Sequence, residues 1–272
     1  MNEVSEKTVT RLREFFLASD RHPSEAELNE LERDTRQGAR QLANILRRRN
    51  VRAQRESRRL DHLLQFEIEL WAQGFRHIAG VDEAGMAPLA GPVVAAAVIL
   101  PHLYKLDGLN DSKKIADERK RQQLADQIKH DAVCWAVGRT EAAEIDSINI
   151  YHSGLLAMRR AVEGLSIPPD YALVDARTIP HYPLPQRGII RGDAQSASIA
   201  AASIIAKTTR DAYMIEMDKV YPGYGFAAHK GYPTPDHLRI LKERGPVSIH
   251  RKTFGPVRDI IFHHSVQREL FT

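Results

Sequence analysis

The N-terminal part of the chain repeats apolar residues at helical spacing. Residues 24–27 read Ser-Glu-Ala-Glu, the form of a capping box, in which serine and glutamate satisfy backbone amides at a helix start. The apolar residues that follow recur as on one face of a helix. They are Leu28, Leu31, Leu42, Ile45 and Leu46, and then Leu60, Leu63, Leu64, Ile68 and Trp71. The pattern predicts an all-helical region over residues 1–72.

From residue 73 the pattern changes to short apolar runs that alternate with helical segments. The predicted strands cover residues 77–82, 93–100, 132–138, 171–175 and 188–193. The predicted helices cover residues 145–165, 196–220 and 235–243. Strands that come first in succession and then alternate with helices are typical of an α/β fold with a mixed sheet flanked by helices.

The composition is that of a globular chain with a mildly basic balance. The 272 residues are 43% hydrophobic with a formal charge of +4, and the mean hydropathy is −0.39, so a core of ordinary size can form. The single cysteine, Cys134, excludes an intramolecular disulfide and a multi-cysteine zinc site. No segment has the apolar core of a signal peptide or the length of a membrane span. We therefore expect a cytoplasmic protein, and the basic balance suits a partner with phosphates.

Four carboxylates lie where predicted strands end. Asp82 and Glu83 close the first strand, and Asp175 and Asp193 each close a later one. In an open α/β sheet, ligands bind beyond the carboxyl ends of the strands. Because adjacent strand residues face opposite ways, Asp82 and Glu83 can serve one site only where the strand stops.

Carboxylates that converge require protons or cations between them. One like-charged pair at about 4 Å costs about 4 kcal/mol at an effective dielectric constant of about 20. Oxygen-only ligands favour Mg²⁺ or Mn²⁺ over zinc, and two such ions suit in-line displacement at a phosphate. The spacing alone leaves a second interpretation open, in which the aspartates only cap strands and turns.

A series of motifs runs from about residue 72 to residue 258. It includes Gly-Val-Asp-Glu-Ala-Gly at 80–85, Leu-Asn-Asp-Ser-Lys-Lys at 109–114 and Ser-Ile-Ala-Ala-Ala-Ser-Ile-Ile-Ala-Lys at 198–207. Further segments lie at 88–93, 174–175, 192–193, 209–211, 221–226, 229–232 and 250–251. The ordered set resembles the bacterial ribonuclease HII family, and the N-terminal helices resemble an extension that some members carry.

The resemblance implies a ribonuclease H-like fold in three parts: a helical arginine-rich extension at 1–72, a catalytic domain at 73–258 and a tail at 259–272. It implies an endoribonuclease that cleaves the RNA strand of RNA–DNA hybrids and the phosphate 5′ to a ribonucleotide embedded in DNA. The products would carry a 3′-hydroxyl and a 5′-phosphate. The family's ligands for two Mn²⁺ or Mg²⁺ ions correspond to Asp82, Glu83, Asp175 and Asp193.

The resemblance also places substrate contacts outside the acids. Ser112, Lys113 and Lys114 correspond to a loop that contacts phosphate, for which hydroxyl and ammonium donors are suited. Tyr232 corresponds to a tyrosine that packs on the sugar beside the ribonucleotide.

Lys207 and Arg210 lie three residues apart, so they share one helix face. Two interpretations stay open for this pair: contact with phosphate, or ion pairs with Asp211 and Glu216.

The chain departs from the family at the loop that reads the 2′-hydroxyl. The family usually has Gly-Arg-Gly where this chain has Gly85, Met86 and Ala87. The change removes a cation and adds a Cβ where glycine allows close approach, but it keeps the backbone donors. We therefore expect an active nuclease with altered or relaxed junction preference. The alternative is a catalytically weak module that binds RNA–DNA hybrids.

Two terminal features suggest partners. Between residues 33 and 59 there are ten arginines and no lysine, a stretch that suits duplex phosphates, although a solvated helix face or a docking surface would look the same. The terminal Gln267, Leu270 and Phe271 belong to a short segment that resembles the peptide by which bacterial proteins bind the replication sliding clamp. A frayed helix end is the alternative for that segment.

Overall fold

The computed structural model describes residues 7–18, 21 and 23–270, and it describes side chains as far as residue 262. The chain forms two compact units that divide between Asp61 and His62. Within the described residues, no helix is long and apolar enough to cross a membrane.

The first unit packs short helices around a small apolar core. α1 spans Val9–Arg13, and a π-helical turn follows at Glu14–Ala18. α2 spans Glu25–Arg33, and α3 spans Gln37–Leu63 and so continues past the unit boundary. The predicted capping box forms between Ser24 and Glu27. The buried core consists of Leu12, Phe16, Leu28, Leu31, Ala39, Leu42, Ala43 and Leu46. The predicted helical region is confirmed.

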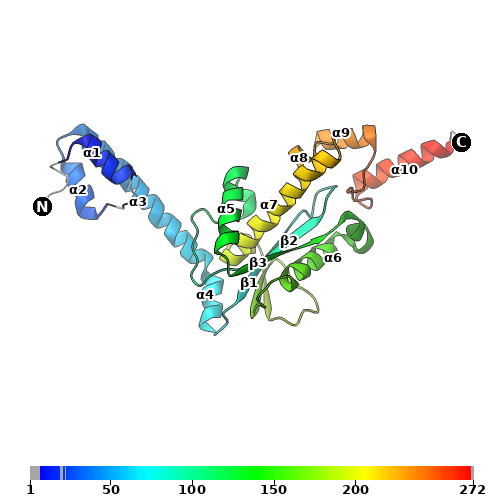
Figure 1. Ribbon diagram of the computed structural model, residues 1–272, viewed down its shortest axis with the longest axis horizontal. Helices are drawn as coiled ribbons and strands as arrows, with labels where there is room; N and C mark the ends of the chain where they lie inside the picture. Colours follow the sequence, from blue (N-terminus) through cyan, green and yellow to red (C-terminus); the bar gives the residue numbers. More distant parts are fainter. Residues whose placement is uncertain (1–6, 19–20, 22, 271–272) are drawn as a thin grey trace. The chain divides into compact units, whose positions relative to one another are not determined.

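The described part of the second unit is built on a five-stranded mixed sheet (Figure 1). The strands are β1 (Ile78–Ala84), β2 (Val93–Ile99), β3 (Cys134–Thr140), β4 (Tyr171–Asp175) and β5 (Gln186–Ile189). Their order is β3-β2-β1-β4-β5, with β3, β2 and β1 antiparallel and β1, β4 and β5 parallel. The predicted mixed sheet is confirmed.

Helices cover both faces of this sheet. α6 (Ala142–Glu163) packs on one face and α7 (Ala197–Val220) on the other, with α5 (Glu118–Asp131) against α7 (Figure 1). Glycine lets α7 approach the sheet closely, since a Cβ on Gly80 would lie 2.0 Å from the Ser198 carbonyl carbon. The unit also contains α4 (Gln65–Ala72), α8 (Phe226–His229), α9 (Pro235–Arg244) and α10 (Gly255–Leu270), with 3₁₀ turns at Ser112–Lys114 and Gly192–Ala194.

α5 and β5 are among the elements that differ from the sequence prediction. α5 is missing from the predicted elements because its apolar stripe is narrow, formed by Leu124, Ala125 and Ile128 among charged and amide residues. β5 ends at Ile189 instead of residue 193, because Arg191 adopts a left-handed conformation with φ 56° that turns the chain out of the strand. The last predicted strand is therefore shorter, and it begins earlier.

A buried carboxylate ties α4 to the start of α7. Glu67 is 2% exposed, and its Oε1 accepts from the Ser196 hydroxyl at 2.6 Å, the Ser198 hydroxyl at 2.6 Å and the Ser198 amide at 3.0 Å. A carboxylate at a helix N-terminus is stabilised by free amides and by the helix dipole. The contact holds the segment that joins α7 to the turn at Gly192–Ala194.

Candidate active site

Asp82 and Glu83 lie inside β1 and not after it. β1 runs to Ala84 in its pairing with β2, whereas its pairing with β4 stops at Val81. The predicted strand end at Asp82 is therefore wrong on the β2 edge. On the other edge, β4 ends at Asp175, so Asp82, Glu83 and Asp175 still share one end of the sheet.

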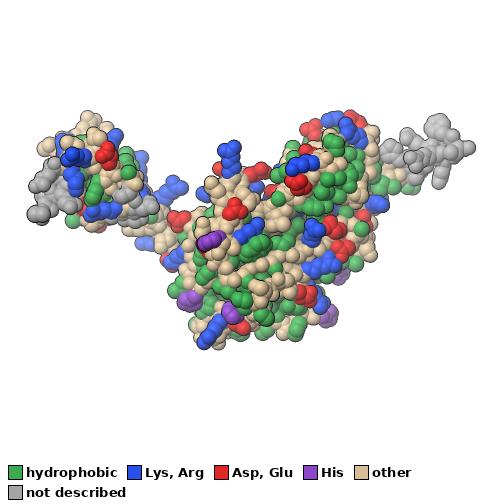
Figure 2. All heavy atoms as spheres, viewed as in Figure 1, with side chains coloured by type: hydrophobic (Ala, Val, Ile, Leu, Met, Phe, Trp, Pro, Cys, Tyr) green, Lys and Arg blue, Asp and Glu red, His purple; other side chains and the backbone are tan. Residues whose placement is uncertain are grey.

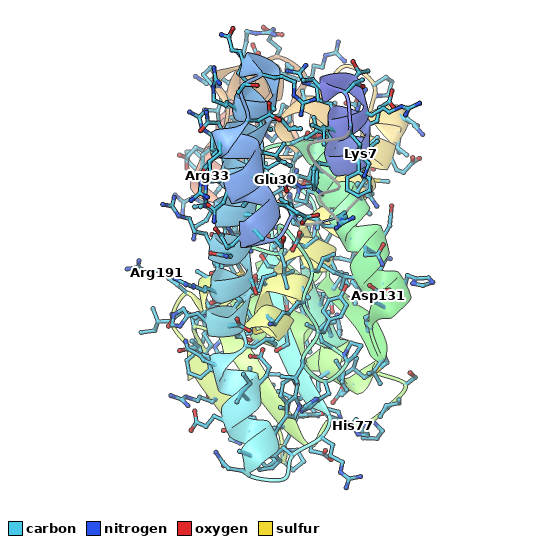
Figure 3. The ribbon with its side chains drawn as sticks, turned by 90° about the vertical axis from the view of Figure 1, so that its left-hand side faces the viewer. Lys7, Glu30, Arg33, His77, Asp131 and Arg191 are labelled. Carbon is cyan, nitrogen blue, oxygen red and sulfur yellow. The ribbon has the colours of Figure 1, made fainter. Side chains whose placement is uncertain are left out.

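Asp193 lies near Asp175 although it does not close a strand. Asp175 Oδ1 accepts from the Gly192 amide at 2.7 Å, which places the 3₁₀ turn beside the end of β4. The prediction that Asp193 ends a strand is wrong because Arg191 turns the chain before it. The exposed Arg191 side chain extends away from the ribbon (Figure 3).

Burial and mutual repulsion raise the pKa values of three of the acids. Burial, and then Glu83 and Asp175, raise the pKa of Asp82 well above its usual value. Burial also raises the pKa of Glu83, and burial together with Asp111 and Asp175 raises the pKa of Asp193. These directions are those expected where anions gather with too little counter-charge.

Lys113 supplies part of that counter-charge from the turn before α5. Its Nζ lies 3.6 Å from Asp193 Oδ2, although the lysine side chain is 73% exposed. Burial opposes the ammonium, but Asp82, Asp193, Asp111 and Asp175 outweigh it and raise the pKa of Lys113. An exposed ion pair of this length contributes little to stability, so the lysine can exchange this partner for another anion.

The oxygen atoms of these acids fit a divalent cation. Asp82 Oδ2 and Glu83 Oε2 are buried without a hydrogen-bond partner among the described residues. A buried carboxylate oxygen without a donor is costly, and a hard cation would remove that cost. In the described part of the chain, no three Asp, Glu, His or Cys side chains converge closely enough to enclose an ion. The acids instead form a looser group around Asp175, whose charge acts on Asp82, Glu83 and Asp193.

Three side chains around these acids were not predicted from the sequence. Ser203 lies close enough to Asp82 to act against the raised pKa of that carboxyl, and its hydroxyl lies 2.9 Å from the Ser112 hydroxyl. Asp111 helps to raise the pKa of Asp193, and Arg177 favours the charged form of Glu83. Ser203 and Asp111 stand inside the segments at 198–207 and 109–114, which was the available signal. No motif pointed to Arg177.

Arg251 holds the loop that follows β1. The side chain is fully buried and donates to the carbonyls of Gly85 (2.6 Å), Met86 (3.1 Å), Pro88 (2.7 Å) and Gly91 (2.9 and 3.0 Å). In a trans peptide, the carbonyl and the following amide point in opposite directions. The two amides after Gly85 and Met86 therefore point away from Arg251.

The loop keeps its backbone path despite the unusual residues. Gly85 has φ 97°, and a Cβ there would lie 2.3 Å from Arg210 Nε, so glycine is required. Met86 packs on the core between the sheet and α6, with Sδ 3.1 Å from the place of a Cβ on Gly154. Ala87 is exposed, and its φ is not positive. Met86 thus anchors the loop by burial.

The remaining predicted substrate residues differ in accessibility. Arg210 is fully buried and donates to three backbone carbonyls at 3.1, 3.1 and 3.0 Å, so the predicted phosphate contact does not fit its position. Lys207 pairs with Asp211 at 2.7 Å, which agrees with the interpretation that this lysine forms an ion pair on its own helix. The Tyr232 ring is 39% exposed and lies 5.8 Å from Lys207 Nζ. Lys114 is exposed.

Histidines support the backbone of Tyr232 from inside. The Tyr232 carbonyl can only accept, so His237 Nδ1 donates to it at 2.8 Å, and His237 Nε2 accepts from His250 Nε2 at 3.1 Å. His250 Nδ1 in turn accepts from the Val247 amide at 2.9 Å. His229 stacks on His237 with ring centroids 4.2 Å apart. This chain of bonds requires His237 and His250 to be neutral.

Acid is expected to destabilise the fold through these two histidines. Burial lowers the pKa of His237 and of His250 to about 4, whereas an unfolded histidine titrates near 6.5. Between these values the unfolded chain binds more protons, so the free energy of unfolding falls as the pH falls. The limiting slope is roughly 1.4 kcal/mol per pH unit for each histidine.

Urea unfolding of the protein and of His237→Gln, from pH 7 to pH 4.5, measures this slope. Asp82, Glu83 and Asp193 act in the opposite direction because their folded pKa values are raised, so the difference between the two proteins isolates the histidine contribution. A difference that does not change with pH would contradict the neutral chain of bonds.

Comparison with known proteins defines the class of this fold and site. Ribonuclease H2 from Pyrococcus horikoshii OT3 is 26% identical with a TM-score of 0.57, over 69% of this chain and 98% of that one. The fold is therefore that of the ribonuclease H-type nucleases. The ribonuclease HII of Myxococcus xanthus (strain DK1622) is 64% identical over 86% of this chain and 80% of that protein. The ribonuclease HII of Anaeromyxobacter sp. (strain Fw109-5) is 51% identical over 99% and 85%.

Family models agree with these relatives along the chain. The model described as Ribonuclease HII matches residues 79–257, and the model described as Ribonuclease HII N-terminal domain matches residues 8–71. The chain belongs to the ribonuclease HII family, and it is an endoribonuclease. The alternative of a binding module with weak catalysis rests on the altered loop alone, whereas the relatives and the family model support the enzyme.

The predicted clamp peptide lies only partly within the residues that the structure describes. Phe271 is outside the described residues, and so are the side chains of Gln267 and Leu270, whose backbone belongs to α10.

Proposed function

We propose that Asp82, Glu83, Asp175 and Asp193 hold two Mn²⁺ or Mg²⁺ ions for hydrolysis of the phosphodiester 5′ to a ribonucleotide. The observation that carries this proposal is the pair of buried, unpartnered oxygens, Asp82 Oδ2 and Glu83 Oε2, in a group of acids with raised pKa values. Such ions polarise the phosphate and make water a better nucleophile. Bst-RNase HIII, solved in complex with Mn²⁺, has the same fold at 17% identity and a TM-score of 0.50, over 69% of this chain and 70% of that one.

The chain's own residues would position the substrate around that centre. Ser203, whose hydroxyl lies 2.9 Å from that of Ser112, stands beside Asp82. Lys113 exchanges its exposed pair with Asp193 for a phosphate oxygen. The amides after Gly85 and Met86, which Arg251 turns outward, offer donors to a 2′-hydroxyl. In this proposal the substrates are RNA–DNA hybrids and DNA with embedded ribonucleotides, handled in the cytoplasm.

Cleavage of a duplex that carries one ribonucleotide tests the proposed function. We expect a single cut on the 5′ side of the ribonucleotide, in Mn²⁺ or Mg²⁺ and not in EDTA, with a 3′-hydroxyl that a polymerase can extend. An all-DNA duplex of the same sequence is the control. A cut that persists in EDTA, or a product with a 2′,3′-cyclic phosphate, would exclude hydrolysis by bound metal.

The double change Met86→Arg with Ala87→Gly is expected to alter junction preference. An arginine at 86 cannot keep the apolar contact at Gly154, so the outward amides shift. One net hydrogen bond is worth roughly 0.5–1.5 kcal/mol, or up to about tenfold. The ratio of kcat/KM on single-ribonucleotide and continuous hybrid substrates measures the effect. Met86→Leu, which keeps the packing, is the control, and an unchanged ratio in the double variant ends the hypothesis.

The arginine-rich helix is proposed to bind duplex phosphates through one exposed row. Arg48, Arg52 and Arg55 are exposed and lie on one side of α3, whereas Arg47 pairs with Glu25 and Glu32. Over the second unit, basic and acidic side chains are interspersed on the face drawn in Figure 2. Replacing the three arginines by Gln should reduce the slope of log KM against log salt concentration, by the equivalent of up to about three phosphate contacts. An unchanged slope would assign these arginines to another role.

The C-terminal peptide is proposed to contact a sliding clamp. The RNase HII of Archaeoglobus fulgidus, solved in complex with PCNA, is 25% identical with a TM-score of 0.50, over 66% of this chain and 96% of that one. Binding of a purified clamp before and after Leu270→Ala with Phe271→Ala tests the contact, and equal binding would refute it.

A further inference from the structure

An exposed aromatic ring stands close to the acids. α6 breaks at Asn149, where φ is 65° and ψ is 166°, and Asn149 Oδ1 accepts from the His152 amide at 3.2 Å to start a second helical segment. Tyr151 lies in the first turn of that segment and is 52% exposed. Single exposed aromatic residues are ordinary on protein surfaces, so the ring needs a second observation before it marks a site.

The second observation is a guanidinium over that ring. Arg177 follows Asp175 by two residues, and its Cζ lies 5.1 Å from the Tyr151 ring centroid. It is also close enough to Glu83 for the two charges to act on each other. Its Nη1 is shielded from water and has no hydrogen-bond partner among the described residues. A guanidinium that has lost water without gaining an acceptor favours a ligand that brings one.

The same pair adjoins the loop proposed to read the ribose. A Cβ on Gly154 would lie 3.1 Å from Met86 Sδ and 3.5 Å from Arg177 Nη1. The absent side chain of Gly154 therefore leaves room for the loop from β1 and for the segment after β4 to meet. Tyr151, Arg177 and Met86 are neighbours at this point, beside Glu83.

A comparable pair elsewhere in the unit shows what a purely structural contact looks like. Arg159 lies 6.0 Å from the Tyr182 ring centroid, and its Nε donates to Glu163 at 2.7 Å. That guanidinium is satisfied within its own helix. Arg177 has the ring and acts on Glu83, but its Nη1 has no acceptor among the described residues, so the fold leaves that donor for another acceptor.

We propose that Arg177 and Tyr151 form a subsite for the nucleotide next to the scissile phosphate. Arg177 donates to a non-bridging phosphate oxygen of the cleaved strand, and the Tyr151 ring packs on the adjoining sugar while it holds the guanidinium in place. A phosphate supplies the anionic acceptor that Arg177 lacks, and aromatic rings bind nucleotides of any sequence. The subsite rests on the proposed function, because it takes the four acids as the cleavage centre.

Kinetics of Arg177→Gln on a duplex with one ribonucleotide test the subsite. We expect KM to rise about tenfold with kcat within about twofold, and the dependence of log KM on log salt to flatten by about one phosphate contact. Tyr151→Ala should raise KM severalfold, and Tyr151→Phe should leave it unchanged because the ring remains. Arg159→Gln, the same change in the satisfied pair, should leave KM and the salt dependence unchanged.

Substrates in which one phosphate is replaced by an uncharged analogue identify the phosphate that Arg177 contacts. A methylphosphonate placed singly at each phosphate within two nucleotides of the cut should, at one position, raise KM for the wild-type protein but not for Arg177→Gln. The subsite is refuted if no position behaves in this way, or if Arg177→Gln lowers kcat without changing KM. Fluorescence anisotropy with the same duplexes measures binding independently of cleavage. If the wild-type protein does not cut but Arg177→Gln weakens binding at one phosphate, the proposed function fails while the subsite stands.

Discussion

Asp82→Asn is expected to abolish cleavage and to stabilise the fold at the same time. Asp82 is 2% exposed, with one oxygen unpartnered and with a raised pKa. A bound metal supplies several kcal/mol of transition-state stabilisation, and each 1.4 kcal/mol is tenfold in rate, so loss of one anionic ligand should lower kcat about a thousandfold or more. Asparagine mimics the protonated acid, so it removes a buried charge that the metal-free fold does not neutralise.

The stability gain has a defined pH dependence. Since the folded pKa of Asp82 is raised, the charged acid destabilises the fold at neutral pH, and the penalty disappears below about pH 4, where folded and unfolded chains are both protonated. Melting in EDTA should therefore show a higher midpoint for Asp82→Asn at pH 7, by about 2–4 °C per kcal/mol, and equal midpoints near pH 3.5. Asp170→Asn, which changes an aspartate that caps backbone amides of Arg76 and His77, is the control and should keep its activity. Full activity in Asp82→Asn would remove this acid from the centre.

The sequence identified the four acids correctly as neighbours at one end of the sheet, but for reasons that hold only in part. Asp175 does end its strand, whereas Asp82 and Glu83 lie inside β1 and Asp193 lies on a 3₁₀ turn. Strand ends follow from hydrophobic alternation only to within a few residues, because pairing on each edge stops separately. The edge facing β4 opens at Asp82, and no local pattern within β1 encodes where β4 stops.

The burial of individual charged side chains also could not be predicted from the sequence. Arg210 stands on α7 three residues after Lys207, and helical spacing treats the two alike. In the fold Lys207 is half-buried in an ion pair, whereas Arg210 is fully buried under backbone carbonyls. Arg177 shows the opposite error, because it belongs to no motif and yet reaches Glu83 from the segment after β4. Contacts of this kind depend on which loops meet over the sheet.

Arg251→Lys is expected to destabilise the protein and to loosen ribose discrimination, although it keeps the charge. Burial and the neighbouring Arg210 lower the pKa of Arg251 to about 9, so the guanidinium stays protonated at neutral pH. Its planar fork reaches four carbonyls of one loop, those of Gly85, Met86, Pro88 and Gly91. An ammonium is a compact group on a flexible stem and cannot reach all four together. Each buried carbonyl left without a donor costs about 1–3 kcal/mol, so a total loss of about 3–5 kcal/mol is expected.

Urea unfolding measures that loss, and Arg244→Lys is its matched control, because Arg244 is exposed and donates to the Pro222 carbonyl at 3.2 Å. The functional effect is measured as the ratio of cleavage rates on single-ribonucleotide and all-DNA duplexes, which should fall at least about tenfold as the loop amides lose their fixed direction. Deuterium uptake by the peptide that spans residues 84–92 reports the same loosening below the melting temperature, even where activity is low. If Arg251→Lys exchanged no faster there than Arg244→Lys and kept its discrimination, the direction of the two amides would have to be set by Met86 packing on Gly154 and not by Arg251.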